Sequence, residues 1–273
     1  MTNTPTHYAS LLSLFASLIV FSSSLAAQEP EWQLGAALSA FNFRLYPGSA
    51  ASRTFMLPLP YFSYTSDLLE IDRGIRGLLP SNSDWYIDIS ADIGLPVNSD
   101  DAVTRSGMPN LDTIIQVGPS LEYTITGSRY NAAEFRLELP LRTAISVSID
   151  QQVNQGWIAE PRLVYEKRRA GTSGLFVKMK TGLRYATQDY HAYYYDVTPA
   201  YVTPERALFK SDSGYSGLVM DVSAAWRQNN IIVWGILRYQ NLNHSVIQDS
   251  PLVEKQDYYL AGIGITWILA ASH

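Results

Sequence analysis

The sequence has 273 residues with 20 Lys and Arg against 25 Asp and Glu, so it lacks the basic excess that nucleic-acid binding normally requires. It contains no cysteine, which excludes disulfides, thiolate metal sites and cysteine nucleophiles. Charged residues make up only 16% of the chain, below the roughly 25% that is usual in soluble domains, while aromatic residues reach 12%.

The N-terminal segment predicts export. An apolar run from Leu11 to Phe21 is followed by small residues, and Ser24 and Ala26 stand where a signal peptidase requires them. At about eleven residues this run is too short to cross ~30 Å of hydrocarbon as a helix. We therefore expect a signal peptide over 1–26 and a mature domain over 27–273.

Apolar and polar residues alternate with period two through the rest of the chain, which predicts strands and no helix of comparable length. In "DTIIQVGPSLEYTIT", for example, Ile115, Val117 and Leu121 share one face, and Gln116 and Glu122 the other. The pattern predicts twelve strands: 32–45, 54–65, 68–72, 75–80, 85–95, 112–126, 134–146, 157–168, 175–187, 215–227, 231–240 and 257–269.

The connections between these strands alternate in length. Short polar turns alternate with longer segments, predicted over 96–111, 147–156, 188–214 and 241–256. Transmembrane barrels show this asymmetry, with turns on the periplasmic side and loops outside, and an even strand count closes such a barrel. A ~25 Å apolar band crossed at ~40° tilt needs about ten residues, which matches these lengths. The fold class predicted is all-β, an antiparallel transmembrane β-barrel.

The segment "EFRLELPLRTAI", which begins at Glu134, shows which face must meet lipid. Its leucines fall on one parity, while Arg136, Glu138 and Arg142 fall on the other. An arginine facing lipid costs ~2–4 kcal/mol near the midplane. In a membrane barrel the leucines must therefore face outward, whereas a soluble sandwich would reverse the two faces.

The charged parity of the strands then predicts the lining of the lumen. Such residues could select solutes in a narrow pore, or pair with one another and fill the barrel, and their mixed signs favour filling. The residues concerned are Asp88, Asp92, Glu122, Arg136, Glu138, Arg142, Glu160, Arg162, Glu166, Lys178, Lys180, Arg184 and Asp221.

Aromatic residues near the strand ends suit the interfacial girdles of a barrel. They are Trp32, Trp85, Tyr123, Trp157, Tyr165, Tyr185, Trp226 and Trp267. The last strand also carries Gly264, Trp267 and Leu269 at the spacing of an outer-membrane insertion signal, followed here by four further residues.

The mature chain resembles the family named for MltA-interacting protein and OmpV. The resemblance is clearest in "YYYDVTPAYVTPERALFKSDSGYSGLVMDVSAAWR" and "DSPLVEKQDYYLAGIGITW", and extends to "LPYFSYTSDLLEIDRGIRGLLP". It implies a barrel in the outer membrane of a Gram-negative bacterium. It further implies a non-enzymatic scaffold that links a murein lytic transglycosylase to a murein synthase, a role that composition and spacing do not show.

Two alternatives remain beside the scaffold. A charged lumen suits a passive or charge-selective channel. A barrel lipid hydrolase would need a Ser–His pair. For that pair the sequence offers His191 with Asp189 and Ser211, or His244 with Asn243 and Ser245, and neither spacing identifies a triad. His191 with Asp189 and Asp196 is a weak metal candidate, and no cofactor motif is present. The tyrosines at 193–195 could contact a ligand or form a lid.

Overall fold

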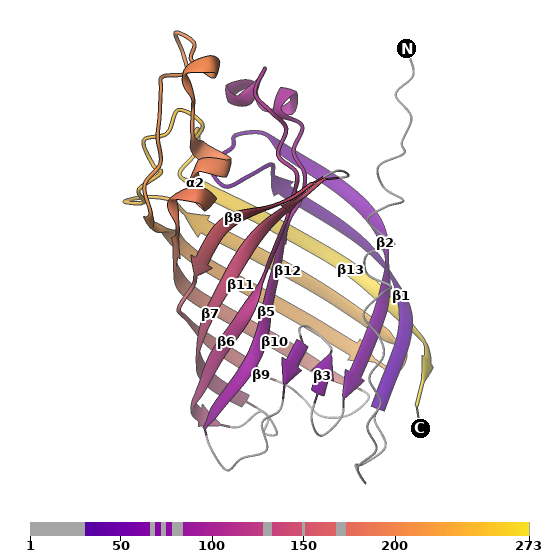
Figure 1. Cartoon of the computed structure of the whole chain (residues 1–273). Helices are drawn as coiled ribbons and strands as arrows, with labels where there is room; N and C mark the ends of the chain where they lie inside the picture. The colour runs from indigo at the N-terminus through magenta and orange to yellow at the C-terminus, as the bar shows by residue number, and fades with distance from the viewer. Residues whose placement is uncertain are drawn as a thin grey trace, which may run out of the picture.

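We describe a computed structural model of the chain (Figure 1). The structure describes residues 31–65, 69–71, 75–77, 84–127, 133–148, 151–167 and 173–272. The predicted signal peptide over 1–26 lies outside the described residues.

The described chain forms one antiparallel sheet. Its strands are β1 Glu31–Arg44, β2 Ser52–Thr65, β3 Leu69–Ile71, β4 Ile75–Gly77, β5 Trp85–Gly94, β6 Thr113–Gly127, β7 Ala133–Val147, β8 Gln152–Ala159, β9 Arg162–Lys167, β10 Ser173–Ala186, β11 Gly214–Gln228, β12 Ile231–Asn241 and β13 Asp257–Ala271. The helical elements are α2 Gln188–Tyr195 and the 3-10 turns η1 Ser99–Asp101, η2 Val103–Arg105 and η3 Pro199–Tyr201.

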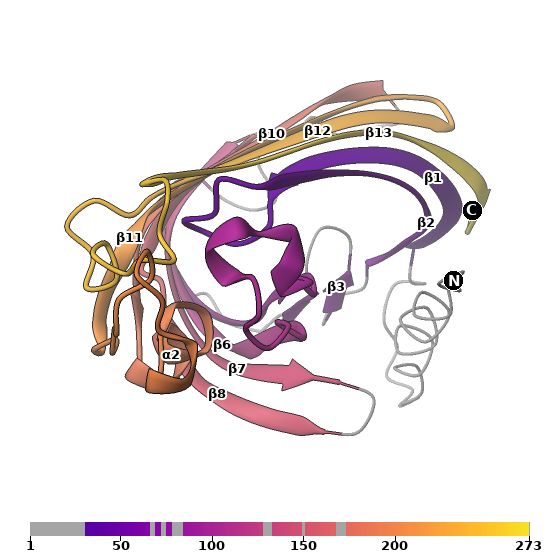
Figure 2. The ribbon, with the colours of Figure 1, turned by 90° about the horizontal axis from the view of Figure 1, so that it is seen from above.

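The sheet closes on itself because the last strand pairs with the first. Ala36 of β1 lies opposite Trp267 of β13, and β13 continues through β12 and β11 to β10. The all-β barrel predicted from period two is therefore present, and the curved wall is visible in Figures 1 and 2.

The strand count of twelve needs correction, because the described residues form thirteen strands. The predicted strand 157–168 is divided between Ala159 and Arg162. Pro161 stands in the interruption, and proline has no N–H to donate to a ladder. Since β8 and β9 both pair with β7 and with β10, they share one position in the wall. The long connection expected over 147–156 is also wrong, since β8 already begins at Gln152.

The alternation on β7 settles which face is outside. Leu139 and Leu141 are 38% and 47% exposed, whereas Arg136 and Glu138 are 0% and 2% exposed. A soluble sandwich would show the reverse. The barrel therefore has an apolar exterior and a charged interior, as expected of a barrel whose strands cross a membrane.

Exposed aromatic side chains lie near both ends of this exterior. Trp85 packs on Tyr123 of the neighbouring strand, with ring centroids 4.7 Å apart. Toward the other end Tyr185 packs on Tyr215, with centroids 5.7 Å apart, and Trp157 is 47% exposed. These positions are those of two interfacial belts.

The long connections fold over one end of the barrel as a cap (Figure 2). A hydrophobic core joins the loop after β1, the loop after β5, α2 and the loop after β12, and it includes Tyr46, Val97, Tyr195 and Ile247. The cap is therefore a packed unit rather than a set of separate loops.

Candidate functional site

The inner face of β7 carries the centre of a buried ion network. The Arg136 guanidinium lies 2.7 Å from a carboxylate oxygen of Glu138, 3.1 Å from Glu134 and 3.2 Å from both Glu122 and Glu166. Glu122 lies directly opposite Glu138 across β6 and β7, a like-charge pairing that would be destabilising without a cation between them. Arg136 therefore compensates four carboxylates at once.

The network continues along the barrel through Arg162, Glu160 and Arg184. Arg162 contacts Glu138 at 2.6 Å and Glu160 at 3.0 Å. Glu160 then receives Arg184 at 2.6 Å and Arg142 at 3.1 Å. Glu160 is 1% exposed, so the break between β8 and β9 places a carboxylate in the interior, where three arginines meet it.

The network then crosses the interior of the barrel. Asp92 of β5 lies 2.9 Å from Arg238 of β12, and Arg238 lies 2.6 Å from Asp221. Strands β5 and β12 are not neighbours in the sheet, so this contact spans the lumen. Arg184 lies 4.0 Å from Asp92 and joins this part to the rest.

Most of the residues predicted to line the lumen belong to this one network. It holds seven carboxylates and six cations: Asp92, Glu122, Glu134, Glu138, Glu160, Glu166 and Asp221, with Arg136, Arg142, Arg162, Lys178, Arg184 and Arg238. Asp88 accepts a hydrogen bond from the backbone N–H of Ile89, and Lys180 lies opposite Asp221 on β11.

Sequence reasoning missed two members of the network. Glu134 has the parity of Arg136, two residues before it on the same strand, so extending the alternation would have found it. Arg238 directly follows the apolar run "IIVWGIL" on β12, and a lone arginine in such a strand was the available signal. Its partner Asp92 lies 146 positions away, which periodicity does not reveal.

The inner faces of β13, β1 and β2 carry mainly apolar and small residues instead. Phe41 and Trp234 of β12 pack with ring centroids 5.9 Å apart above two glycines. A Cβ at Gly262 would overlap the Phe41 ring, and one at Gly264 would overlap the Trp234 ring. The glycine of the predicted insertion motif therefore makes room for an inward-facing tryptophan.

The tyrosines of α2 hold the cap together. The Tyr195 hydroxyl donates to the Pro47 carbonyl at 2.8 Å, and the Tyr193 hydroxyl donates to the Asp112 carbonyl at 3.1 Å. Arg105 donates to the Tyr194 carbonyl at 2.8 Å. The segment thus forms part of a lid that joins three loops, one of the two interpretations that the sequence left open.

His191 is fully buried and lies between two partners. Its Nδ1 is 2.6 Å from the Asp212 carbonyl, which can only accept, so Nδ1 carries the proton and Nε2 accepts from the Ser216 hydroxyl at 2.6 Å. Burial lowers the pKa of His191 below its ordinary value. A Ser–His pair exists, but with Ser216 rather than Ser211, and both side chains are closed to a substrate.

The other residues considered for catalysis or metal binding do not come together in one site. Asp196 accepts the Ser211 N–H at 2.7 Å. His244 has a positive φ of 62° and its N–H donates to Gln248, which marks a turn residue. Within the described residues no three His, Asp or Glu side chains are grouped to hold a metal. No described helix is long and apolar enough to span a membrane.

A closed antiparallel barrel with an apolar, aromatic-belted exterior and a charged, capped interior defines a transmembrane β-barrel protein. A family model described as "MltA-interacting protein MipA" matches residues 34–269. The chain therefore belongs to the MltA-interacting protein family.

Other comparisons add little. No curated protein matches the chain significantly. Among solved structures, the outer membrane protein OprG from Pseudomonas aeruginosa is 10% identical, covers 86% of this chain and 93% of its own, and has a TM-score of 0.19. The Pseudomonas putida toluene transporter TodX is 8% identical, with 90% of each chain covered and a TM-score of 0.27. At such scores no activity of these proteins is transferred to this chain.

Proposed function

We propose that this protein is a non-enzymatic, non-conducting barrel of the Gram-negative outer membrane that serves as a scaffold in murein turnover. The observation that carries the non-conducting part is the ion network, whose buried charges compensate one another and reach across the lumen between Asp92 and Arg238. Ions in transit would have to displace these paired groups. The cap further closes one end of the barrel.

The scaffold part rests on family membership. The family is described as MltA-interacting, so the partner proposed is a murein lytic transglycosylase, and with it a murein synthase. Crosslinking in intact cells, followed by mass spectrometry of the captured chains, tests this assignment. Repeated capture of either murein enzyme is expected, and consistent absence of both under conditions that capture other envelope partners would refute it.

The channel is the competing function, and conductance separates the two. Planar bilayers containing the purified barrel should show no discrete steps. As a matched control, Glu160→Ala should disturb the network, because three arginines would lose their shared carboxylate. Steps in the wild type would reject the filled lumen.

A further inference from the structure

The outward face of the wall carries two charged side chains where β1 and β13 meet the cap. Alternation places Arg44 of β1 and Asp257 of β13 on the same parity as Leu38 and Ile263, which are 58% and 67% exposed. Within the described parts of β1, β2 and β5 to β13, no other charged side chain lies on the outward parity at the cap end. Because β1 and β13 are paired, the two charges occupy one part of the exterior.

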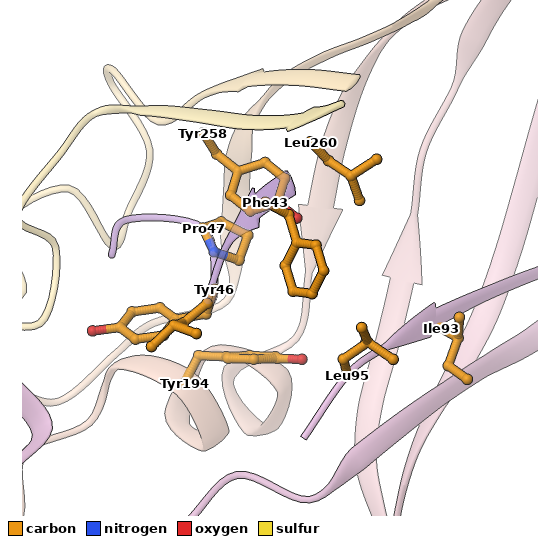
Figure 3. A pocket seen from close by; sticks show the side chains of 10 residues that line it. Phe43, Tyr46, Pro47, Ile93, Leu95, Tyr194, Tyr258 and Leu260 are labelled. Atoms are coloured by element: carbon orange, nitrogen blue, oxygen red, sulfur yellow. The ribbon is translucent and has the colours of Figure 1, made fainter. Parts of the chain in front are cut away.

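Figure 3 shows the opposite parity of the same two strands. Phe43 of β1 and Leu260 of β13 line a cavity of about 80 Å³ beneath the cap. Successive side chains of a strand point to opposite faces, so Arg44 and Tyr259 are directed away from that cavity, and so is Asp257. A ligand of these side chains therefore approaches from the bilayer and not from the lumen.

The pairing of the strands fixes how the outward side chains are arranged. Arg44 is the neighbour of Tyr259 in the register of β1 on β13, and Tyr259 pairs with Tyr239 of β12. The two tyrosine rings have centroids 5.2 Å apart. Asp257 lies two residues from Tyr259 toward the cap, which makes it a diagonal neighbour of Arg44 at roughly 7–8 Å. The charge of Arg44 acts on the Asp257 carboxylate at this separation.

Each of the two charges keeps part of its hydrogen-bonding capacity. Asp257 Oδ1 accepts from the Tyr239 hydroxyl at 2.6 Å and from the Asn241 amide at 2.9 Å, whereas its Oδ2 has no partner among the described residues. Arg44 Nη1 donates to the Ser49 carbonyl at 2.9 Å, and no carboxylate in the described part of the chain lies at ion-pair distance from its guanidinium. The wall therefore presents a carboxylate oxygen and guanidinium donors side by side, not a closed ion pair.

The outward face remains polar for one more residue pair in the direction of the membrane. Asn42 precedes Arg44 on the outward parity of β1, and its amide donates to the Thr54 hydroxyl of β2 at 2.8 Å. The next outward pair is Ala40 and Met56, and Met56 is 79% exposed. Along the strands the face therefore changes from charged to neutral polar to apolar, which is the order of headgroup, ester and acyl chain in a phospholipid.

The two signs of charge select the headgroup. A phosphate alone would suit Arg44 but would be repelled by Asp257. A zwitterionic headgroup suits both, because the guanidinium donates to phosphate oxygens and an ammonium group donates to Asp257 Oδ2. The Tyr259 ring, 47% exposed beside them, can also receive the ammonium by a cation–π contact. The short ethanolamine link between phosphate and ammonium matches charges on diagonal neighbours.

We propose that the outward face of β12, β13, β1 and β2 at the cap binds one phospholipid with a phosphoethanolamine headgroup. Arg44 holds the phosphate, Asp257 and Tyr259 hold the ammonium group, and the Thr54 hydroxyl donates to an ester carbonyl. The site requires that the barrel lies in a bilayer, but it does not depend on the murein role, so each can fail without the other.

The test is native mass spectrometry of the full mature barrel, released from nanodiscs that contain equal amounts of phosphatidylethanolamine, phosphatidylcholine and phosphatidylglycerol. The barrel should retain phosphatidylethanolamine about tenfold more than phosphatidylglycerol, equivalent to about 1.4 kcal/mol of binding free energy. Phosphatidylcholine should also be retained less, because its trimethylammonium group has no N–H to donate to Asp257. Equal retention of the three lipids by the wild type would overturn the proposal.

Three variants assign the two charges. Asp257→Asn keeps the shape of the side chain but removes its charge, so the preference for phosphatidylethanolamine over phosphatidylglycerol should disappear. Arg44→Gln should lower the retention of all three lipids, because each carries a phosphate. Lys167→Gln is the matched control, since Lys167 is an exposed outward cation at the end of β9 away from the cap, and retention should not change.

Folding of each variant is checked by its heat-modifiable mobility on a detergent gel. If Asp257→Asn does not fold, Tyr259→Leu removes the ring that the ammonium group contacts and should lower the same preference. A folded Asp257→Asn barrel that keeps the wild-type preference would refute the site. Displacement of the bound phosphatidylethanolamine by a phosphorylated glycolipid without ethanolamine would also refute it, because Asp257 would then have no role.

Discussion

Replacing Arg136 by methionine tests whether the ion network stabilises the barrel. Arg136 is completely buried, and its guanidinium lies within 3.2 Å of four carboxylates. After the change Glu138 keeps Arg162 and Glu166 keeps Lys178, while Glu134 keeps the hydrogen bond from Thr124. The variant therefore leaves buried carboxylates with less compensation than they had.

Removing one partner of a buried ion pair costs about 3–5 kcal/mol, because the remaining charge stays desolvated. A typical net stability is about 5–15 kcal/mol, so Arg136→Met should lose a large part of it. Urea unfolding of the barrel in phospholipid bicelles, followed by tryptophan fluorescence, measures the change as a lower midpoint at constant slope.

Two further variants make this result specific. Arg53→Met breaks the ion pair with Asp101, whose side chains are 33% and 40% exposed, and should cost only about 0–1 kcal/mol. The double variant Arg136→Met/Glu134→Gln should regain part of the loss. The reasoning fails if Arg136→Met shifts the midpoint no further than Arg53→Met, or if the double variant is less stable than the single one.

Three other predictions follow from the cap, the last strand and the exterior. Burial lowers the pKa of His191, so the neutral imidazole stabilises the cap at pH values above the ordinary pKa of 6.5. This stabilisation is lost as the pH falls from 6.5 through the lowered pKa. Hydrogen exchange over 196–213 should therefore quicken on acidification, and in His191→Gln the exchange rate should be insensitive to pH in that window. Gly264→Ala should destabilise the barrel by about 1–3 kcal/mol through contact with Trp234, and Gly264→Ala/Trp234→Leu should recover stability in the same urea titration. Leu139→Arg should lower the free energy of unfolding by about 2–4 kcal/mol, because the arginine would face lipid. Val103→Arg in the cap, where Val103 is 89% exposed, should leave the urea midpoint unchanged. Equal effects of the two variants would contradict the orientation of β7.

Period-two alternation was sufficient to predict the barrel because a strand presents opposite faces to lipid and lumen. On β7 it placed Leu139 outside and Arg136 inside, and the structure has both there. It did not predict the interruption at Pro161, because a proline within one strand and a proline between two strands give similar patterns of hydrophobicity.

What the sequence did not reveal depends on contacts between distant segments. The contact between His191 and Ser216 requires the loop after α2 to return to β11, and periodicity carries no information on that path.

The charged and mainly apolar parts of the interior occupy different arcs of the wall, and this division decides how far the ion network extends. Asp92 and Ile93 are adjacent on β5 and point to opposite faces. The carboxylate is held inward by Arg238, 2.9 Å away, while the isoleucine is 46% exposed on the outer face. An arginine on that outer face would meet lipid at a cost of about 2–4 kcal/mol, so the charges of the network stay on the inner parity. The inner parity of β2 carries Phe55, Leu57 and Leu59 instead, and Arg53 on the same parity pairs with Asp101 of the cap, so the arc formed by β2 adds no partner to the network.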